Sequence, residues 1–233
     1  MKQKIVFKAD LDGSVDGELV LLENLRFWPG ETENDDEFAD KLAEFGEVYV
    51  NEAFGNSHRE HASMIKLAEL LPHAAGQHLE EEVRVLTNVL EIPARPFLSV
   101  VGGAKIETKV PVITNLAKIS HHVLVGGELP KEIEKTGQKF PENVIVAKLT
   151  DDKFDIDLES AHRFSRYISN ARTIVWNGPM GFFEEGHETG SRTIANAIIE
   201  SKAYSVVGGG ETTQFLEKHG LLGRFSFVSA GGG

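Results

Sequence analysis

The sequence contains no cysteine, and no stretch of it approaches the roughly 18 apolar residues that a membrane-spanning helix needs. The absence of cysteine excludes a disulfide framework and thiol chemistry, and it fits a reducing compartment. The opening residues, MKQKIVFKAD, lack the apolar core of a secretory signal peptide. We therefore expect a soluble protein of the cytoplasm that has no membrane partner.

Basic residues are also scarce in this chain. It has 24 Lys and Arg against 36 Asp and Glu, which gives a formal net charge of -12 at pH 7. Such an acidic chain disfavours nucleic acid, or an anionic membrane surface, as the main partner. Any anionic small molecule must be bound by local groups, because the net negative charge of the chain repels it.

Several common fingerprints of nucleotide and metal sites are missing. The sequence has no G-x-x-x-x-G-K-[ST], no G-x-G-x-x-G after its first predicted strand, and neither the H-R-D nor the D-F-G signature of protein kinases. His58 and His61 stand three residues apart, but no carboxylate of clear spacing completes a zinc site with them. We expect no zinc site.

What the sequence does contain is a regular alternation of strand and helix patterns, in a chain of 233 residues that can hold one large domain or two small ones. Apolar β-branched runs predict strands at 4–9, 18–23, 47–51, 97–101, 122–126, 143–147, 173–176, 204–208 and 225–229. Helical periodicity predicts helices at 36–45, 78–90, 106–117, 157–169, 188–200 and 212–220. This alternation predicts an α/β fold with mainly parallel sheets covered by helices.

One predicted helix is a candidate connector between two lobes. Its apolar residues share one face: Leu79, Val83, Leu86 and Leu90. The following IPARP breaks the pattern, so we place a boundary near Pro93. The predicted organisation is a first lobe over 1–78, a connecting helix over 79–93 and a second lobe over 94–233.

The first lobe offers only about three predicted strands. A sheet this small exposes an apolar edge unless something covers it. We therefore predict marginal stability for the lobe, or self-association of the chain.

Glycines follow most of the predicted strands in the second lobe, as GGAK, GGE, NGPMG, GGGETT and SAGGG. For any single strand, a tight turn is a sufficient reason. In a parallel sheet, however, all these turns gather at the carboxyl edge, where open α/β sheets bind ligands. Helix N-termini at that edge offer free N–H groups that bind phosphate. The repetition predicts the floor of a nucleotide or phosphate site.

Longer strings carry a resemblance to a known family: LLENLRFWPGE, VYVNEAFGNSHREHAS, RPFLSVVGGAKIETK, TIVWNGPMGFFE, VVGGGETT and FVSAGGG. In content and order they resemble phosphoglycerate kinases, from about residue 18 to the end. The resemblance implies two Rossmann-like lobes and a glycolytic phosphotransferase with a carboxyl acceptor. Such an enzyme moves a phosphoryl group between 1,3-bisphosphoglycerate and ADP, or between ATP and 3-phosphoglycerate, with Mg²⁺.

In the first lobe, Arg26 and Arg59 match the family's arginines that hold the acid substrate and its phosphate. Arginine suits this role because its guanidinium binds phosphate with two parallel hydrogen bonds. The alternative for each is an exposed structural salt bridge. Asn51 and His58 flank the same loop, where they either orient the site or serve as a cap and a surface imidazole.

In the second lobe, Lys105 and Lys109 match catalytic lysines of the family. The transition state of phosphoryl transfer spreads negative charge over equatorial oxygens, so positioning and charge stabilisation dominate catalysis. Two lysines four residues apart lie on one face of a helix. The alternative is that both lysines only keep the surface of the helix solvated.

The terminal Gly231, Gly232 and Gly233 match the family's triple glycine, whose amides help stabilise the transferring group. Gly232 and Gly233 are therefore predicted catalytic residues, together with Arg26 and the two lysines.

The resemblance also implies a set of nucleotide-binding residues around the strand-end glycines. Besides the two lysines, it comprises Gly103, Ala104, Gly127, Asn177, Pro179, Gly181, Phe182, Glu184, Gly210, Glu211 and Thr212. Glu184 would bind the ribose hydroxyls, and Glu211 would hold Mg²⁺. The family usually has aspartate in the place of Glu211, and the longer carboxylate still suits a hard cation.

Compared with the family that it resembles, the sequence is expected to be a shortened relative, without the family's N-terminal segment, part of the middle of the C-terminal lobe and the C-terminal tail. We therefore keep two hypotheses: a phosphoglycerate kinase, acting alone or completed by a second chain, and a non-catalytic relative that retains adenine-nucleotide binding. Turnover with ATP, Mg²⁺ and 3-phosphoglycerate distinguishes them.

Overall fold

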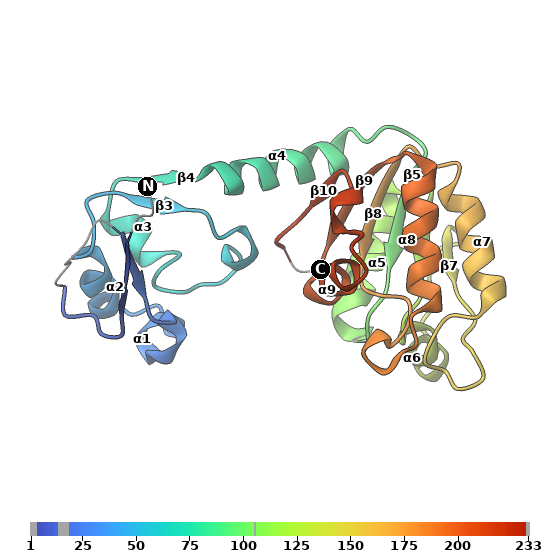
Figure 1. Ribbon diagram of the computed structural model, residues 1–233, viewed down its shortest axis with the longest axis horizontal. Coiled ribbons are helices and arrows are strands. Elements are labelled where there is room, and N and C mark those ends of the chain that lie inside the picture. The colour runs from blue at the N-terminus through green and yellow to red at the C-terminus, as the bar shows by residue number, and fades with distance from the viewer. Residues whose placement is uncertain (1–3, 14–18, 105, 232–233) are drawn as a thin grey trace. The chain divides into compact units, whose positions relative to one another are not determined.

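The computed structural model describes residues 4–13, 19–104 and 106–231 of the chain. The chain divides into two compact units, Met1–Val83 and Arg84–Gly233. The division falls inside helix α4 (Gln77–Glu91), the long green helix of Figure 1 and the predicted connecting helix. Among the described residues, no helix is long and apolar enough to cross a membrane.

The second unit is built on one six-stranded sheet in the order β10-β9-β8-β5-β6-β7 (Figure 1). Its strands are β5 (Phe97–Val101), β6 (His122–Val125), β7 (Val144–Val146), β8 (Thr173–Asn177), β9 (Tyr204–Gly208) and β10 (Phe227–Val228). Every neighbouring pair in this sheet is parallel. The structure thus confirms the predicted strands of the second lobe and their parallel arrangement.

Helices cover both faces of this sheet, which explains why its central strands are almost entirely apolar. Side chains alternate along β5: Leu98 and Val100 join one buried cluster, and Val101 joins another. The first cluster receives α7 (Leu158–Ile168), α8 (Thr189–Ser201) and α9 (Gly210–Lys218), and the second receives α5 (Ile106–Ile119) and α6 (Leu129–Thr136). All of these helices except α6 were predicted. The segment of α6, LPKEIEKT, is only eight residues long, and its amphipathic pattern was not singled out from the sequence.

The first unit contains two separate parallel pairs of strands and a few short helices. The strand pairs are β1 (Ile5–Lys8) with β2 (Leu19–Leu22) and β3 (Tyr49–Asn51) with β4 (His73–Ala75), and the helices are α1 (Pro29–Thr32), α2 (Asp36–Ala43) and α3 (Lys66–Leu70). The prediction of one sheet with about three strands was wrong. The strand β4 has the sequence HAA, which carries no β-branched residue and gives no strand signal.

An apolar face of the β1–β2 pair is open to solvent. Ile5 pairs with Leu19, and Phe7 pairs with Leu21. These four side chains alternate with less exposed neighbours, so they lie on one face, and they are 43 to 59% exposed. The buried core of the unit is small, with only Phe38, Ala39, Leu42 and Ala62 in its described cluster. A unit that exposes apolar strands over so small a core is expected to have low stability.

We predict that the first unit opens more readily than the second. In hydrogen exchange measured by mass spectrometry, peptides of residues 19–75 should lose protection at least about tenfold faster than peptides of β5 and β8, because local opening there breaks few buried contacts. Sedimentation velocity on the same sample provides the control for association. Equal protection of both units in a strictly monomeric sample would contradict the prediction.

Candidate functional site

The turns at the carboxyl edge of the six-stranded sheet pack directly on one another. The amide of Gly102 donates to the carbonyl of Asn177 at 2.8 Å, and the amide of Gly127 donates to the carbonyl of Met180 at 3.1 Å. A Cβ on Gly102 would lie 2.1 Å from the carbonyl oxygen of Pro179, and one on Gly178 would lie 2.2 Å from the carbonyl carbon of Gly102. The glycines are therefore needed for backbone-to-backbone contact, and their gathering at one edge confirms the prediction.

The hydrogen bonds correct one part of that prediction, because most of these glycine amides are not free for a ligand. The amides of Gly102, Gly103, Gly126, Gly127 and Gly209 donate to backbone carbonyls, and that of Gly178 donates to the Thr212 hydroxyl. Most of these amides therefore form hydrogen bonds that join one turn to another. The amides that bind phosphate must belong to other residues.

Free amides stand at the start of α9. The N–H groups of Gly210, Glu211 and Thr212 make no hydrogen bond within the described part of the chain, as expected for the first turn of a helix. The Thr212 hydroxyl accepts from the amide of Gly178 at 2.7 Å, and Thr212 is fully buried. This bond holds the start of α9 against the turn after β8. The first turn of α9 is thus a fixed site with partial positive charge.

Lys109 supplies the cation of the same site. Its Nζ donates to Oδ1 of Asn177 at 2.6 Å, which links α5 to the end of β8. Burial lowers the pKa of the Lys109 ammonium, and the negative charge of Glu211 opposes this shift. One pocket is lined by Lys109, Asn177, Gly210, Glu211 and Thr212 together with neighbouring glycines. An ammonium held beside free helix amides is suited to bind a polyphosphate.

A second pocket adjoins the first and shares Gly103, Ala104 and Glu211 with it. The remaining residues that line it are Gly127, Glu128, Pro179, Gly181, Phe182 and Glu184. The two pockets thus collect every predicted nucleotide-binding residue that the structure describes. Lys105, Gly232 and Gly233 lie outside the described residues, whereas the carbonyl of Gly231 accepts from the amide of Gly209 at 3.1 Å.

Sequence reasoning did not single out Phe154, which lines neither pocket but lies next to the pocket residue Phe182. Its ring lies 6.4 Å from the ring of Phe182, and the two side chains are 46% and 39% exposed. Large aromatic side chains left this exposed beside a pocket are suited to contact a planar ligand. A lone phenylalanine in the charged stretch DDKFD carried no pattern that could assign it to the site.

Asp155 fixes the position of Phe154. Asp155 is 4% exposed, and its two carboxylate oxygens accept from the amides of Ile156 and Gly190 at 2.8 and 2.9 Å. Burial raises the pKa of Asp155, and the two amide bonds oppose that change. The carboxylate lies close to Gly181 as well, where an added Cβ would approach it to 2.5 Å. Asp155 therefore joins its own segment, the turn after β8 and the start of α8.

We predict that Asp155→Ala lowers the free energy of unfolding by about 2 kcal/mol, because it leaves two buried amides without an acceptor. It should also weaken binding of Mg·ADP, since Phe154 loses its anchor. Asp151→Ala is the matched control, because Asp151 is exposed in the same segment. Urea denaturation should place Asp151→Ala within about 0.5 kcal/mol of the parent chain. Equal unfolding midpoints for the two variants would refute the anchoring role.

The first unit holds the predicted acid-substrate residues. The Arg26 guanidinium donates to Oδ1 of Asn56 at 2.7 Å, and the backbone amide of Arg59 donates to the carbonyl of Asn56 at 3.0 Å. Neither arginine forms a salt bridge within the described part of the unit, so that alternative is not supported. Asn51 accepts from the amide of Ala53 at 2.8 Å at the end of β3, whereas the following 3-10 helix has Ala53 as its N-cap residue and no side-chain cap. His58 lies exposed beside Arg59 in a surface pocket.

The residues present fit a magnesium ion that arrives with a nucleotide. Among the described residues, no group of three or more His, Cys, Asp or Glu side chains could hold a metal ion. Mg²⁺ in phosphate chemistry is commonly bound by one or two carboxylates together with the phosphates of the substrate. Glu211, exposed at the first turn of α9 and lining both pockets, can be such a carboxylate.

A parallel α/β unit that gathers an ammonium, free helix amides and a carboxylate at the carboxyl edge of its sheet belongs to the class of nucleotide-binding α/β proteins. Comparison with known proteins defines the family. The sequence model of the family described as Phosphoglycerate kinase matches residues 3–140 and 128–233. The chain belongs to the phosphoglycerate kinase family.

Individual relatives agree with this assignment. The chain is 38% identical to a phosphoglycerate kinase of Rubrobacter xylanophilus over 92% of its own length and 66% of the relative's. It is also 38% identical to one of Prosthecochloris aestuarii, covering 94% of this chain and 68% of that one. The chain thus spans about two thirds of the length of the curated relatives that it matches.

Solved structures give the same fold. A phosphoglycerate kinase from Coxiella burnetii superposes with a TM-score of 0.78 at 31% identity, covering 98% of this chain and 72% of that one. One from Pyrococcus horikoshii superposes with a TM-score of 0.84 at 24% identity, covering 98% and 73%. At 24% identity, the match to the Pyrococcus horikoshii structure shows similarity of fold alone. Together they agree with the predicted α/β class and with a chain shorter than its relatives.

Proposed function

We propose that this chain transfers a phosphoryl group between 1,3-bisphosphoglycerate and ADP, and in reverse between ATP and 3-phosphoglycerate, as a glycolytic phosphoglycerate kinase. The observation that carries the proposal is the cluster of Lys109, Asn177 and the free amides of Gly210, Glu211 and Thr212 at one edge of the sheet. These groups suit the β- and γ-phosphates of an adenine nucleotide. The adjoining pocket, with Phe182 and Glu184, suits the adenosine.

In the proposed reaction, the bond between phosphorus and the carboxyl oxygen of the acyl phosphate breaks. A new bond forms between that phosphorus and a β-phosphate oxygen of ADP, and the acid leaves as a carboxylate. Negative charge spreads over the transferring oxygens in the transition state. Lys109 stabilises this charge, and Lys105 and the amides of Gly232 and Gly233 take the same part by resemblance to the family.

Mg²⁺ enters this proposal as part of the nucleotide co-substrate. When bound, it neutralises charge on the phosphates. Glu211 holds it through one carboxylate, and the start of α9 fixes the position of that carboxylate.

Arg26 and Arg59 are proposed to bind the acid substrate. Both side chains are exposed, and Arg26 bonds Asn56 through its guanidinium whereas Arg59 bonds it through its backbone amide, so the two residues belong to one loop region of the first unit. We keep the lobe boundaries at 1–78, 79–93 and 94–233 as part of the same proposal, with the phosphoryl donor and acceptor bound by different lobes.

The second candidate is a non-catalytic nucleotide-binding module. It is favoured by the position of both nucleotide pockets, whose lining residues all belong to the second unit. A coupled assay on the full chain with ATP, Mg²⁺ and 3-phosphoglycerate, beside a calorimetric titration with Mg·ADP, separates the two. Turnover that depends on Arg26 and Lys109 supports the kinase. Binding of Mg·ADP without turnover supports the module, and neither signal refutes both.

We also propose that the chain works in the cytoplasm and associates with itself, or with a complementing chain, through the exposed face of Ile5, Phe7, Leu19 and Leu21. Burial of four large apolar side chains favours association. Phe7→Lys should shift sedimentation velocity toward the monomer, whereas Lys4→Gln, beside this strand, should not. A parent chain that sediments only as a monomer would rule out self-association. We propose no nucleic-acid or membrane partner.

A further inference from the structure

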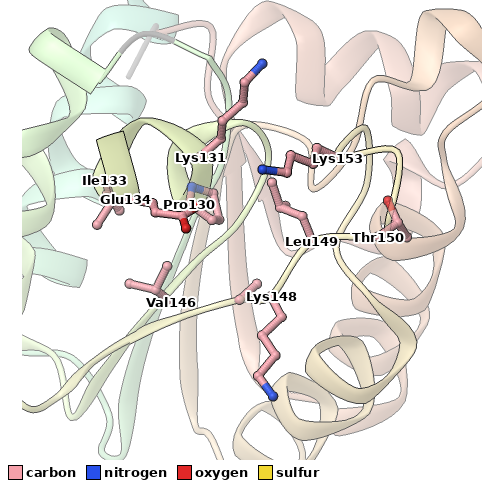
Figure 2. Close-up of a pocket in the computed structure, with 10 residues that line it drawn as sticks. Pro130, Lys131, Ile133, Glu134, Val146, Lys148, Leu149, Thr150 and Lys153 are labelled. Carbon is pink, nitrogen blue, oxygen red and sulfur yellow. The ribbon is translucent and has the colours of Figure 1, made fainter. Parts of the chain in front are cut away.

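A groove lies beside α6, apart from the two pockets described above (Figure 2). It runs between α6 and the stretch 146–153 that follows β7, and its volume is about 510 Å³. None of the residues that line it lines the pocket of Lys109 or the pocket of Phe182. Because it opens at the carboxyl end of β7, it belongs to the edge of the sheet where α/β proteins bind ligands.

The floor of this α6 groove is apolar. Ile133 and Val146 pack against the buried cluster on the α5 side of the sheet, and Ala147 and Leu149 belong to the cluster on the other side. The groove therefore opens at the seam where the two clusters meet the surface. A concave apolar floor of this kind fits the apolar body of a ligand.

The rim of the α6 groove is basic in an otherwise acidic chain. Lys131, Lys148 and Lys153 line it, against Glu134 as its acidic residue. Within the described part of the chain, none of the three lysines forms an ion pair. In Figure 2 the amine of Lys153 is directed back across the groove toward Pro130 and Lys131, whereas the amines of Lys131 and Lys148 lead away at opposite ends.

The groove lies where this chain departs from its family. Residues 128–140, which include α6, fall in both matches to the family's sequence model, so the match to the family is interrupted in this region. The alignment with a relative from Nitratiruptor extends over 293 residues, more than the 233 of this chain. The relative thus carries residues that this chain does not have, and the overlap of the two family-model matches lies beside the groove.

We propose that the α6 groove binds a small organic anion, a ligand with an aromatic or aliphatic body and one carboxylate or phosphate group, at a site separate from the nucleotide pockets. The apolar floor takes the body. Lys153, whose amine is directed across the groove, takes the charge. The three lysines of the rim, which form no ion pair within the described part of the chain, favour an anion over a neutral ligand locally, against the net charge of -12 of the whole chain.

The test is a titration of the ¹⁵N-labelled full chain with 2-naphthoate, followed by NMR. We expect the amides of Ile133, Ala147 and Leu149 to shift, with a dissociation constant on the order of 1 mM. The neutral analogue 2-naphthalenemethanol should bind at least about threefold more weakly. Saturating Mg·ADP should shift Gly210, Glu211 and Thr212 and leave the naphthoate shifts in place.

Matched lysine variants test which lysine binds the carboxylate of the ligand. Lys153→Gln should weaken naphthoate about fivefold, because it removes one cation close to the carboxylate and keeps a residue of similar size. Lys135→Gln is the control, since Lys135 lies on α6 but does not line the groove, and it pairs with Glu132 at 3.5 Å. Loss of the naphthoate shifts on addition of Mg·ADP, or equal affinity in both variants, would overturn the proposal. Absence of Mg·ADP shifts would count against the proposed function alone.

Discussion

Replacing Lys109 by alanine is expected to abolish turnover while leaving the affinity for Mg·ADP within a few fold. The ammonium is held by Asn177 at 2.6 Å in a half-buried position, where its charge acts through little water. Removing one such group from a transition-state site costs about a hundredfold to a thousandfold in kcat. The loss should fall on kcat, because the charge that Lys109 stabilises develops only during transfer.

Lys118→Ala is the matched control for Lys109→Ala. Lys118 lies on the same helix, is exposed, and donates only to Asn115 at 2.8 Å. Steady-state kinetics and calorimetry on both variants should leave Lys118→Ala near the parent. If Lys109→Ala instead lost most of its affinity for Mg·ADP, Lys109 would be a ground-state phosphate ligand and its assigned role in transfer would be wrong.

The pH dependence offers a further check on Lys109. Burial lowers the pKa of its ammonium, so the folded protein favours the neutral amine more than the unfolded chain does. The cation is fully present only below this lowered pKa. Activity should therefore fall as the pH rises toward the ordinary pKa of lysine, and Lys109→Arg should move that loss to higher pH, because arginine stays protonated.

The parallel sheet could be read from the sequence because its strands carry strong signals. Stretches such as FLSVV and TIVW are largely buried on both faces, and glycine follows FLSVV directly and TIVW after Asn177. The gathering of those glycines at one edge followed from the parallel topology alone. The first unit could not be read in this way, because a strand such as HAA depends on its pairing partner and not on its own residues.

The sequence predicted where the site lies but not which of its backbone amides are already hydrogen-bonded. The sequence indicated which glycines mark the edge, whereas it could not show that the amides of Gly102 and Gly127 are used by neighbouring carbonyls. That pairing depends on the order β8-β5-β6, which brings turns far apart in the sequence together. Phe154 and Asp155 were missed for the same reason, since their role depends on contact with the turn after β8.

Gly127→Ala should damage both stability and nucleotide binding. Gly127 has φ +66°, and an added Cβ would lie 2.6 Å from the amide nitrogen of Gly103 and 3.0 Å from the carbonyl oxygen of Pro179. Both neighbours are backbone atoms of other turns, so they cannot rotate away. We expect a loss of about 3 kcal/mol or more in the free energy of unfolding, from the strained φ and the crowding together, and at least tenfold weaker binding of Mg·ADP.

Gly137→Ala separates crowding from backbone strain. Gly137 has φ +69°, almost the same as Gly127, but an added Cβ would meet nothing within 4 Å. This variant should lose only about 1 to 2 kcal/mol, the cost of a left-handed conformation for an L-residue, and should bind Mg·ADP as the parent does. Urea denaturation and calorimetry measure both effects. Similar results for the two alanine variants would mean that the glycines serve only their φ angles, and that close packing of the turns does not shape the nucleotide site.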